Sequence, residues 1–241
     1  MHHIQPPASR AEPIDSQPSL FNMNQKELLR QIGLIDINLL DQIMKGRFDP
    51  SMRVLDAGCG NGRNLVWFLR GGFQVHGIDQ DEESVAATAK LAAKLAPHLP
   101  DSNFRQESIE ALPFRNETFD LVICIAVLHF AKDEEHFYHM FNELMRVLKP
   151  GGIMFIRLAT SIGLEERIRK VEGLRYRLPD GTERFLVDEK TIYNFTKEYG
   201  STMVEPIKTV NVQNERCMTT WVLKKGKSEL APTPTPEGEE V

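Results

Sequence analysis

Residues 52–64 have the sequence Met-Arg-Val-Leu-Asp-Ala-Gly-Cys-Gly-Asn-Gly-Arg-Asn, and their order is the strongest indication of the fold in this 241-residue chain. Val54 and Leu55 predict a short buried strand, because such side chains suit a sheet that is covered on both faces. Three glycines follow, and an apolar pattern with helical spacing begins at Leu65. Glycine lets backbone approach a ligand closely, and a helix start presents unpaired amides. The stretch therefore predicts a ligand-binding strand, loop and helix.

Asp56 precedes the first of these glycines by two residues. The glycines have the spacing G-x-G-x-G, whereas a pyrophosphate-binding loop has G-x-G-x-x-G and no carboxylate facing the phosphates. Two unit charges a few Å apart interact by about 4 kcal/mol at an effective dielectric near 20. A carboxylate here should therefore repel a dinucleotide and attract a cation. This favours S-adenosylmethionine as the cofactor over the nicotinamide dinucleotide of a reductase.

A second acidic residue, Asp79, ends the strand predicted at 73–78. It follows Gly58 by about the 20 residues expected between a glycine loop and the acid that binds ribose hydroxyls. A carboxylate can accept hydrogen bonds from both hydroxyls, and Gln80 is expected at the adenosine edge. An alternative stays open, in which Asp79 only caps the helix predicted at 84–95.

Residues 55–64 resemble the first signature of the class I S-adenosylmethionine-dependent methyltransferases, and within them the tellurite-resistance and thiopurine branch. The resemblance implies an α/β fold, a Rossmann-like three-layer sandwich with a seven-stranded, mostly parallel sheet of order 3-2-1-4-5-7-6. Strand 7 is then antiparallel. The cofactor-binding residues that it implies in this loop are Asp56, Gly58, Cys59, Gly60 and Asn61.

Residues 107–114 are similar to the family's Gly-Asp-Ala-x-x-Leu-Pro-Phe stretch, in which the acid holds the adenine amino group. Ser108 replaces that acid with an uncharged acceptor, and Ile109 is expected to pack on the ring. The strand predicted at 119–124 leads into residues 125–130. Because ligands bind beyond the carboxyl ends of parallel strands, Cys124 and Ile125 should also border the cofactor.

Methyl transfer depends mainly on placing a nucleophile in line with the methyl carbon, and such positioning can lower the barrier by about 7 to 11 kcal/mol. If the acceptor carries a proton, His129 is the candidate general base; the alternative is a packing role. Arg157, at the end of the fifth strand, is a candidate for holding an anionic substrate. The alternative for the basic segment 157–187 is a solvated insertion whose charges are balanced by its own acids.

The domain organisation expected from the sequence is one methyltransferase domain at 21–225. Residues 1–20 and 226–241 are rich in proline and polar side chains, which predicts disorder. Between 24 and 44, apolar residues predict two helices broken near Gly33, either a lid over the cofactor or a pair packed on the sheet. Two further strands are predicted at 203–212 and 217–223.

Composition and motifs narrow the classes of partner that the chain is expected to bind. A formal charge of −5 makes nucleic acid an unlikely partner in this interpretation, and the Asn/Asp-Pro-Pro-Tyr/Phe box of nucleic-acid amino methyltransferases is missing. Three widely spaced cysteines suggest neither disulfides nor a metal site. The absence of a long apolar run or a signal-peptide core predicts a cytoplasmic protein without membrane contact. The expected activity is methylation of a small molecule; methylation of protein or nucleic acid, or cofactor binding without turnover, are the alternatives.

Overall fold

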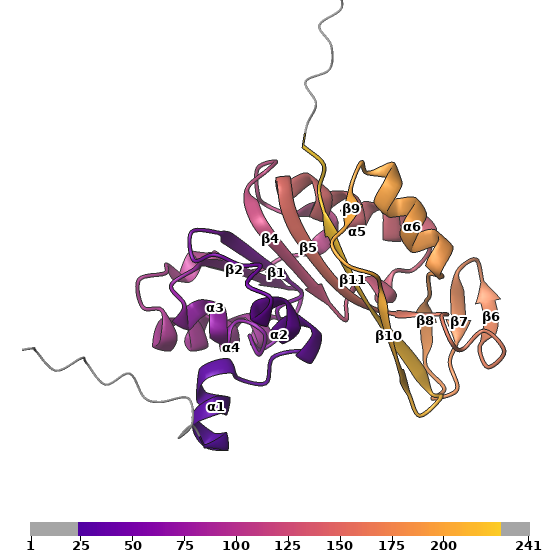
Figure 1. Ribbon diagram of the computed structural model, residues 1–241, viewed down its shortest axis with the longest axis horizontal. Helices are drawn as coiled ribbons and strands as arrows, with labels where there is room; N and C mark the ends of the chain where they lie inside the picture. Colours follow the sequence, from indigo (N-terminus) through magenta and orange to yellow (C-terminus); the bar gives the residue numbers. More distant parts are fainter. Residues whose placement is uncertain (1–23, 228–241) are drawn as a thin grey trace, which may run out of the picture.

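The computed structural model of the protein describes residues 24–227, and its main feature is one twisted sheet (Figure 1). The disorder predicted for 1–20 lies outside these residues, as does that predicted for 226–241 except at Gly226 and Lys227. The strands of the sheet are β1 (Arg53–Ala57), β2 (Gln74–Asp79), β3 (Phe104–Gln106), β4 (Phe119–Ile125), β5 (Leu148–Thr160), β9 (Thr202–Met203), β10 (Lys208–Val212) and β11 (Arg216–Lys224).

The strand order confirms the predicted topology. The order is β10-β11-β5-β4-β1-β2-β3, which is 3-2-1-4-5-7-6 when it is read from β3, and β9 pairs with β11 in addition. The neighbours from β3 to β5 are parallel, and β11 runs antiparallel to β5. Parallel neighbours need crossover connections, and helices provide them here.

Helices cover both faces of the sheet, which makes the three layers. Those on one face are α2 (Ile37–Met44), α3 (Val66–Arg70) and α4 (Glu82–Leu95), and those on the other are α5 (Glu134–Val147) and α6 (Glu189–Glu198). The first group packs around Phe68 and Phe73, and the second around Phe141 and Trp221. Carboxylates define the helix starts: Asp133 accepts the amide of His136 at the start of α5. The predicted α/β sandwich is therefore confirmed.

Two N-terminal helices occupy the region where helical spacing predicted them. They are α1 (Gln25–Ile32) and α2, separated by Gly33 with φ +67°. Asp36 caps α2 by accepting the amide of Asn38 at 2.9 Å. Whether the pair acts as a lid stays a prediction.

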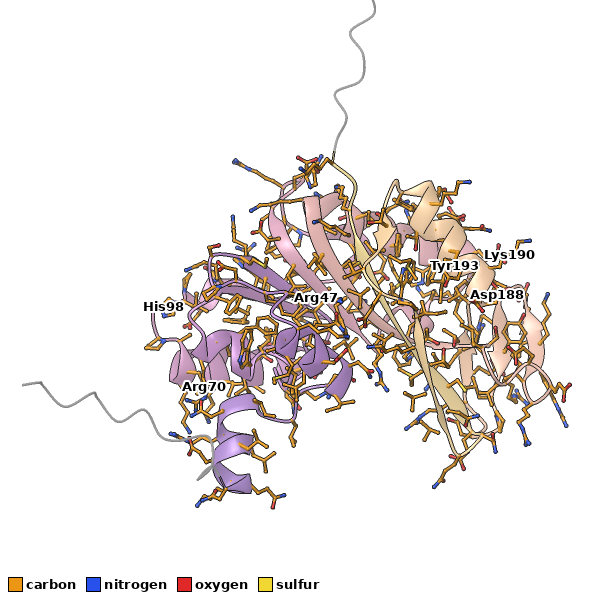
Figure 2. All side chains as sticks on the ribbon, in the orientation of Figure 1. Arg47, Arg70, His98, Asp188, Lys190 and Tyr193 are labelled. Carbon is orange, nitrogen blue, oxygen red and sulfur yellow. The ribbon has the colours of Figure 1, made fainter. Side chains whose placement is uncertain are left out.

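Ion pairs fix α2 to the segment before β10. Asp41 and Glu205 each contact both Lys45 and Lys208 at 2.6 to 2.8 Å. Arg47, labelled in Figure 2, adds a contact of 3.2 Å with Glu205. These hydrogen-bonded lysines lower the pKa of Asp41 to about 2. The end of α2 is therefore held by electrostatic contacts.

Residues 157–187 contain a small separate sheet. Its strands are β6 (Arg169–Glu172), β7 (Arg175–Arg177) and β8 (Glu183–Phe185), in the order β6-β7-β8. The predicted turn at 178–181 joins β7 to β8, with Gly181 at φ +83°. Asp188, labelled in Figure 2, caps α6 immediately afterwards.

Two predicted boundaries were wrong. The sequence Lys-Pro-Gly-Gly at 149–152 is typical of a helix end followed by a turn, but it lies inside β5, where Gly151 adopts φ +77° and donates to the Lys225 carbonyl. The strand expected over 203–212 is divided into β9 and β10, because Pro206 between them has no amide to donate to a ladder. Within residues 24–227, no helix is both long and apolar enough to cross a bilayer.

Candidate active site

The glycine loop after β1 uses its own amides inside the protein. The amides of Gly58 and Cys59 both donate to the Ile78 carbonyl at 2.8 Å. The amide of Gly60 donates to Oδ2 of Asp79, also at 2.8 Å. A pyrophosphate-binding loop directs such amides at phosphate oxygens. Here these three amides are already engaged within the protein and are not available to a phosphate, which distinguishes the loop from a dinucleotide site.

A cavity of about 380 Å³, called the first cavity here, lies beyond the carboxyl ends of β1, β2 and β4. Its lining includes five residues that the sequence analysis named, which are Gly58, Asp79, Gln80, Ile109 and Ile125. Three strand ends and the turn after β3 therefore bring these five together, although 67 positions separate the first from the last.

Asp79 lies in the lining and holds the loop as well. Besides the Gly60 amide, it accepts the Asp81 amide on Oδ1 at 3.1 Å. Asp81 is the residue that caps α4, by accepting the amide of Ser84. The alternative role of Asp79 as a helix cap is therefore wrong. A carboxylate with two oxygens can still accept further hydrogen bonds from a ligand.

Gln80 and Ser108 act as a pair rather than as two independent contacts. Nε2 of Gln80 donates to Oγ of Ser108 at 3.1 Å, and Gln106 donates to the Gln80 carbonyl at 3.0 Å. Ser108 thus lies behind Gln80, which faces the cavity. The direct adenine contact expected of Ser108 stays a prediction.

Asp56 is fully buried at the end of β1. Burial raises the pKa of its carboxyl to about 8, with Arg63 opposing the shift and Asp79 adding to it. Among residues 24–227, nothing hydrogen-bonds to either carboxylate oxygen. The reason given for Asp56 from sequence, an exposed anion that repels phosphate, therefore needs correction, because the side chain points into the interior. Without a ligand this carboxyl therefore keeps its proton up to about pH 8, and a cation bound near it would favour the ionised form.

The other loop and strand residues named from sequence support the first cavity from outside its lining. Cys59 and Cys124 are buried thiols, and burial raises the pKa of both, that of Cys59 to about 12. The Gly60 carbonyl accepts Oγ1 of Thr88 on α4 at 2.6 Å. Asn61 is exposed on the loop. Their cofactor contacts remain predictions.

Sequence reasoning missed a pair on the α5 side of the first cavity. Oε1 of Glu110 lies 2.5 Å from Nε2 of His136. Because Nδ1 of His136 accepts the Lys132 amide, Nε2 carries the proton and donates to Glu110. The two residues are 26 positions apart, and no motif connects them. Three more lining residues, Ala126, Val127 and Phe130, lie in the segment 125–130 that strand order had indicated.

A second cavity, of about 330 Å³, lies on the other side of Ala126. Ala126 lines both cavities and has φ +61°, a left-handed conformation that is costly for a residue with a Cβ. The lining also contains His129 and Arg157, the two candidates for catalysis and substrate binding. The structure therefore places these candidates apart from the first cavity, next to the residue that the cavities share.

His129 is held as a neutral ring. Its Nδ1 accepts the Ala159 amide at 3.0 Å, so the ring proton is on Nε2. Burial, together with the charges of Arg184 and Arg216, lowers its pKa to about 4. A general base needs an accessible lone pair, and the lone pair here is already used. The geometry does not support the base role expected from sequence.

Arg157 forms an ion pair within the fold. Its Nη1 lies 3.0 Å from Oδ2 of Asp36, and the side chains are 18% and 6% exposed. Asp36 is the residue that caps α2, so this contact joins the N-terminal helices to the end of β5. The charge of Arg157 is therefore largely matched before any ligand binds, which weakens the substrate role expected of it.

Gly58→Ala should lower thermal stability clearly more than Gly60→Ala. A Cβ at Gly58 would lie 2.3 Å from Cγ2 of Val127, and φ is +88° there. At Gly60, φ is +51° but nothing lies within 4 Å, so only the conformational cost applies. Each 1 kcal/mol lost should lower Tm by about 2 to 4 °C in a chain of this size. Differential scanning calorimetry measures the Tm of both variants and of the wild type. Gly58→Ala with Val127→Ala should recover part of the loss, and equal Tm values for the two single variants would contradict the clash.

Comparison with known proteins agrees with this geometry. Residues 55–156 match the family described as a methyltransferase domain. A SAM-dependent methyltransferase from Methanosarcina mazei superposes with TM-score 0.62 at 19% identity, covering 77% of this chain and 97% of its own. The fold is therefore the one seen in S-adenosylmethionine-dependent methyltransferases, and residues 55–156 are similar to a methyltransferase domain.

The relatives are similar over part of their length. Ubiquinone biosynthesis O-methyltransferase of Mesorhizobium japonicum is 33% identical over 138 residues, which is 56% of this chain and 52% of that protein. Putative methyltransferase YqeM of Bacillus subtilis is 30% identical over 115 residues, 47% of this chain and 45% of its own. The chain spans about half the length of these curated relatives. The 1,6-didemethyltoxoflavin-N1-methyltransferase of Burkholderia thailandensis shares the fold, with TM-score 0.62 and 18% identity, covering 84% of this chain and 82% of its own.

Proposed function

We propose that this protein is an enzyme that binds S-adenosylmethionine in the first cavity and methylates a small molecule by in-line displacement. The observation that carries the proposal is the hydrogen bonding of the loop. The amides of Gly58, Cys59 and Gly60 are engaged within the protein, while the Asp79 carboxylate lines the cavity. Such a site disfavours phosphate and offers acceptors to hydroxyl groups and cations.

The residues present fit this cofactor. Asp79 would accept the ribose hydroxyls, and Gln80 and Ile109 would border the adenine. Gly58 keeps space open where a Cβ would collide with Val127. The buried Asp56 carboxylate, which has no hydrogen-bond partner in the described part of the chain, would balance a positive charge near the loop. Cys59, Gly60, Asn61, Ser108 and Cys124 complete the proposed set, either as loop backbone or as supporting side chains.

The chain contributes positioning more than proton transfer in this mechanism. When bound, the cofactor supplies a methyl group on a sulfonium, which is electrophilic without further activation. Phe130 and Ile125 give the first cavity apolar walls. His129 fixes the 126–130 turn against β5 through the Ala159 amide. Positioning of this kind can supply about 7 to 11 kcal/mol.

His129 should stay neutral in the folded protein to well below pH 6. Burial lowers its pKa to about 4, and free histidine titrates near 6.5. A histidine with a lowered folded pKa costs stability as the pH falls from about 6.5 towards 4, because the unfolded chain takes up the proton first. Nitrogen-15 NMR of the ring should show the Nε2–H tautomer without titration down to pH 5. A midpoint near 6.5 would contradict the buried, hydrogen-bonded ring.

Calorimetry with S-adenosylhomocysteine and with NAD tests the proposed cofactor. We expect saturable binding of the first and none of the second, because the loop amides have no room for a phosphate acceptor. Adenosine serves as the control for the part that the two ligands share. Tighter binding of NAD would refute the proposal. Incubation with methyl-labelled S-adenosylmethionine and a cell extract then tests turnover, and label in small metabolites alone supports a small-molecule acceptor.

The finer parts of the proposal have different support. The ubiquinone and toxoflavin methyltransferases named above act, by their names, on small molecules, and the net charge of −5 disfavours nucleic acid. The tellurite-resistance and thiopurine branch rests on residues 55–64 alone, and the cytoplasmic location on sequence alone.

A [4+2]-cyclase, SpnF, shares the fold with TM-score 0.60, 18% identity and coverage of 79% of this chain and 80% of its own. A role without methyl transfer is therefore the second candidate, and absence of any transferred label would favour it.

We also propose that α1 and α2 cover the site as a lid. The contact between Asp36 and Arg157 supports this, because it fixes the start of α2 at the end of β5, where the second cavity opens. The ion pairs of Asp41 and Glu205 fix the other end of the helix. These contacts attach α2 at both ends.

A further inference from the structure

The second cavity has a basic lining on an apolar base. Its titratable residues are the arginines at 157, 184 and 216, the neutral His129 and Asp180. The walls between them come from Ala126, Ala159, Leu178, Val212 and Met218. The lining thus contains three guanidinium groups and one carboxylate, and its apolar part suits the hydrocarbon portion of a small molecule.

Two of these arginines keep their charge available. Arg157 is matched by Asp36, as described above. Within residues 24–227, neither Arg184 nor Arg216 forms an ion pair with a carboxylate. Arg184 donates to the Glu183 carbonyl and lies over the Phe130 ring at 4.8 Å, which orients its guanidinium. Arg216 is exposed at the first residue of β11.

Arg184 and Arg216 line the second cavity together with His129 and Asp180, so both charges act in the same space. Both lower the pKa of His129, after burial, and both lower the pKa of Asp180, after its hydrogen bond with Thr182. Asp180 is already occupied, since Oδ1 accepts both the amide and the hydroxyl of Thr182. A positive region therefore remains at the mouth of the second cavity.

The shared wall connects this region with the first cavity. Ala126 lines both, and Phe130, on which Arg184 lies, lines the first. The two cavities are therefore neighbours that meet at Ala126. The strained φ of +61° keeps the Ala126 side chain at this position.

We infer that the second cavity is the acceptor site and that Arg184 and Arg216 hold an anionic group of a small organic acid whose apolar part lies against Ala159, Leu178 and Met218. This inference rests on the proposed function for the identity of the neighbouring ligand. Arginine suits the task because its planar fork matches a carboxylate and stays charged. The anionic group is an anchor in this proposal, and the methyl-accepting atom lies elsewhere on the molecule.

Two methionines allow each cavity to be observed separately. Met218 lines the second cavity and Met140 the first. In the full chain labelled with [¹³C-methyl]methionine, and assigned with Met218→Leu and Met140→Leu, benzoate should shift the Met218 signal saturably. Benzamide, which has the same shape without the charge, should bind at least about tenfold more weakly, as expected for a charge-assisted hydrogen bond.

Arginine variants decide the assignment. Arg184→Gln and Arg216→Gln should each weaken benzoate binding at Met218 by about tenfold or more. Arg177→Gln is the matched control, because Arg177 lies on the same hairpin, is 60% exposed and pairs with Glu183 instead. It should leave benzoate binding unchanged. Equal binding of benzoate and benzamide, or equal losses in all three variants, would overturn the inference.

The same titration separates this inference from the proposed function. S-adenosylhomocysteine should shift Met140, and benzoate should still shift Met218 in its presence. If S-adenosylhomocysteine leaves Met140 unchanged while benzoate shifts Met218, the cofactor proposal fails and the anion site stands. If Met140 responds and Met218 does not, the anion site fails and the cofactor proposal stands.

Discussion

Asp79→Asn should weaken S-adenosylhomocysteine binding by about 100-fold or more while the protein remains folded. The carboxylate lines the first cavity and also accepts the amides of Gly60 and Asp81. Asparagine has the same size as aspartate but replaces one acceptor oxygen with an NH2 donor. That donor would face either a backbone amide, which is also a donor, or the ligand hydroxyl that needs an acceptor. Each lost charge-assisted hydrogen bond is worth about 1.5 to 3 kcal/mol, and two of them give the expected factor.

Asp81→Asn is the matched control for this change. Asp81 is exposed, is two positions away and caps α4 through the amide of Ser84, a role that asparagine performs equally well. Affinity should therefore stay within about twofold of the wild type. Circular dichroism and Tm show whether both variants are folded. Asp79→Asn with unchanged affinity by calorimetry would remove Asp79 from the cofactor site.

Asp56→Asn should stabilise the ligand-free protein, and the gain should grow with pH. The folded pKa of Asp56 is raised to about 8, whereas an unfolded aspartate titrates near 3.9. Between these values the folded state holds a proton that the unfolded state has released, so the free energy of unfolding falls as the pH rises. Asparagine does not ionise and escapes this cost. The same change should weaken cofactor binding, because it removes the charge that balances a cation.

Thermal melts of the ligand-free protein at pH 5, 6.5 and 8 measure this effect. At pH 8 the variant should exceed the wild type by more than about 2 to 4 °C, the shift that 1 kcal/mol produces in a chain of this size. Asp101→Asn, at an exposed carboxylate, is the control and should give no such trend. A difference between Asp56→Asn and wild type that is the same at all three pH values would show that the carboxyl is not buried in the ligand-free protein.

The sequence predicted the fold well where local pattern and motif spacing agree. The strand order was implied by the family resemblance of residues 55–64, and the break at Gly33 follows from a residue type that acts within a few positions. The boundaries of β5 were missed because the bulge at Gly151 depends on Lys225, 74 positions later in the chain. Such a contact has no local pattern.

The site was predicted in part for the same reason. Asp79 was found because its distance from the loop is fixed by the strand–helix–strand unit. The burial of Asp56, by contrast, depends on side chains from several strands, and alternation along β1 does not reveal it. The neutral state of His129 follows from the amide of Ala159, 30 positions away, and from two distant arginines. Motifs give the position of a residue in a fold, but packing decides its charge.

In the proposed enzyme, Ala126 restricts how the acceptor could change during evolution. Left-handed backbone at +61° is tolerated by glycine, asparagine and aspartate, and it is strained for branched or bulky residues. The wall between the two cavities can therefore hardly thicken by point substitution. Diversification of the acceptor is directed instead to the hairpin of β7 and β8, whose turn tolerates insertions and whose side chains reach the same space. A library that varies residues 178–184 should yield altered acceptor preference far more often than one that varies residues 124–128.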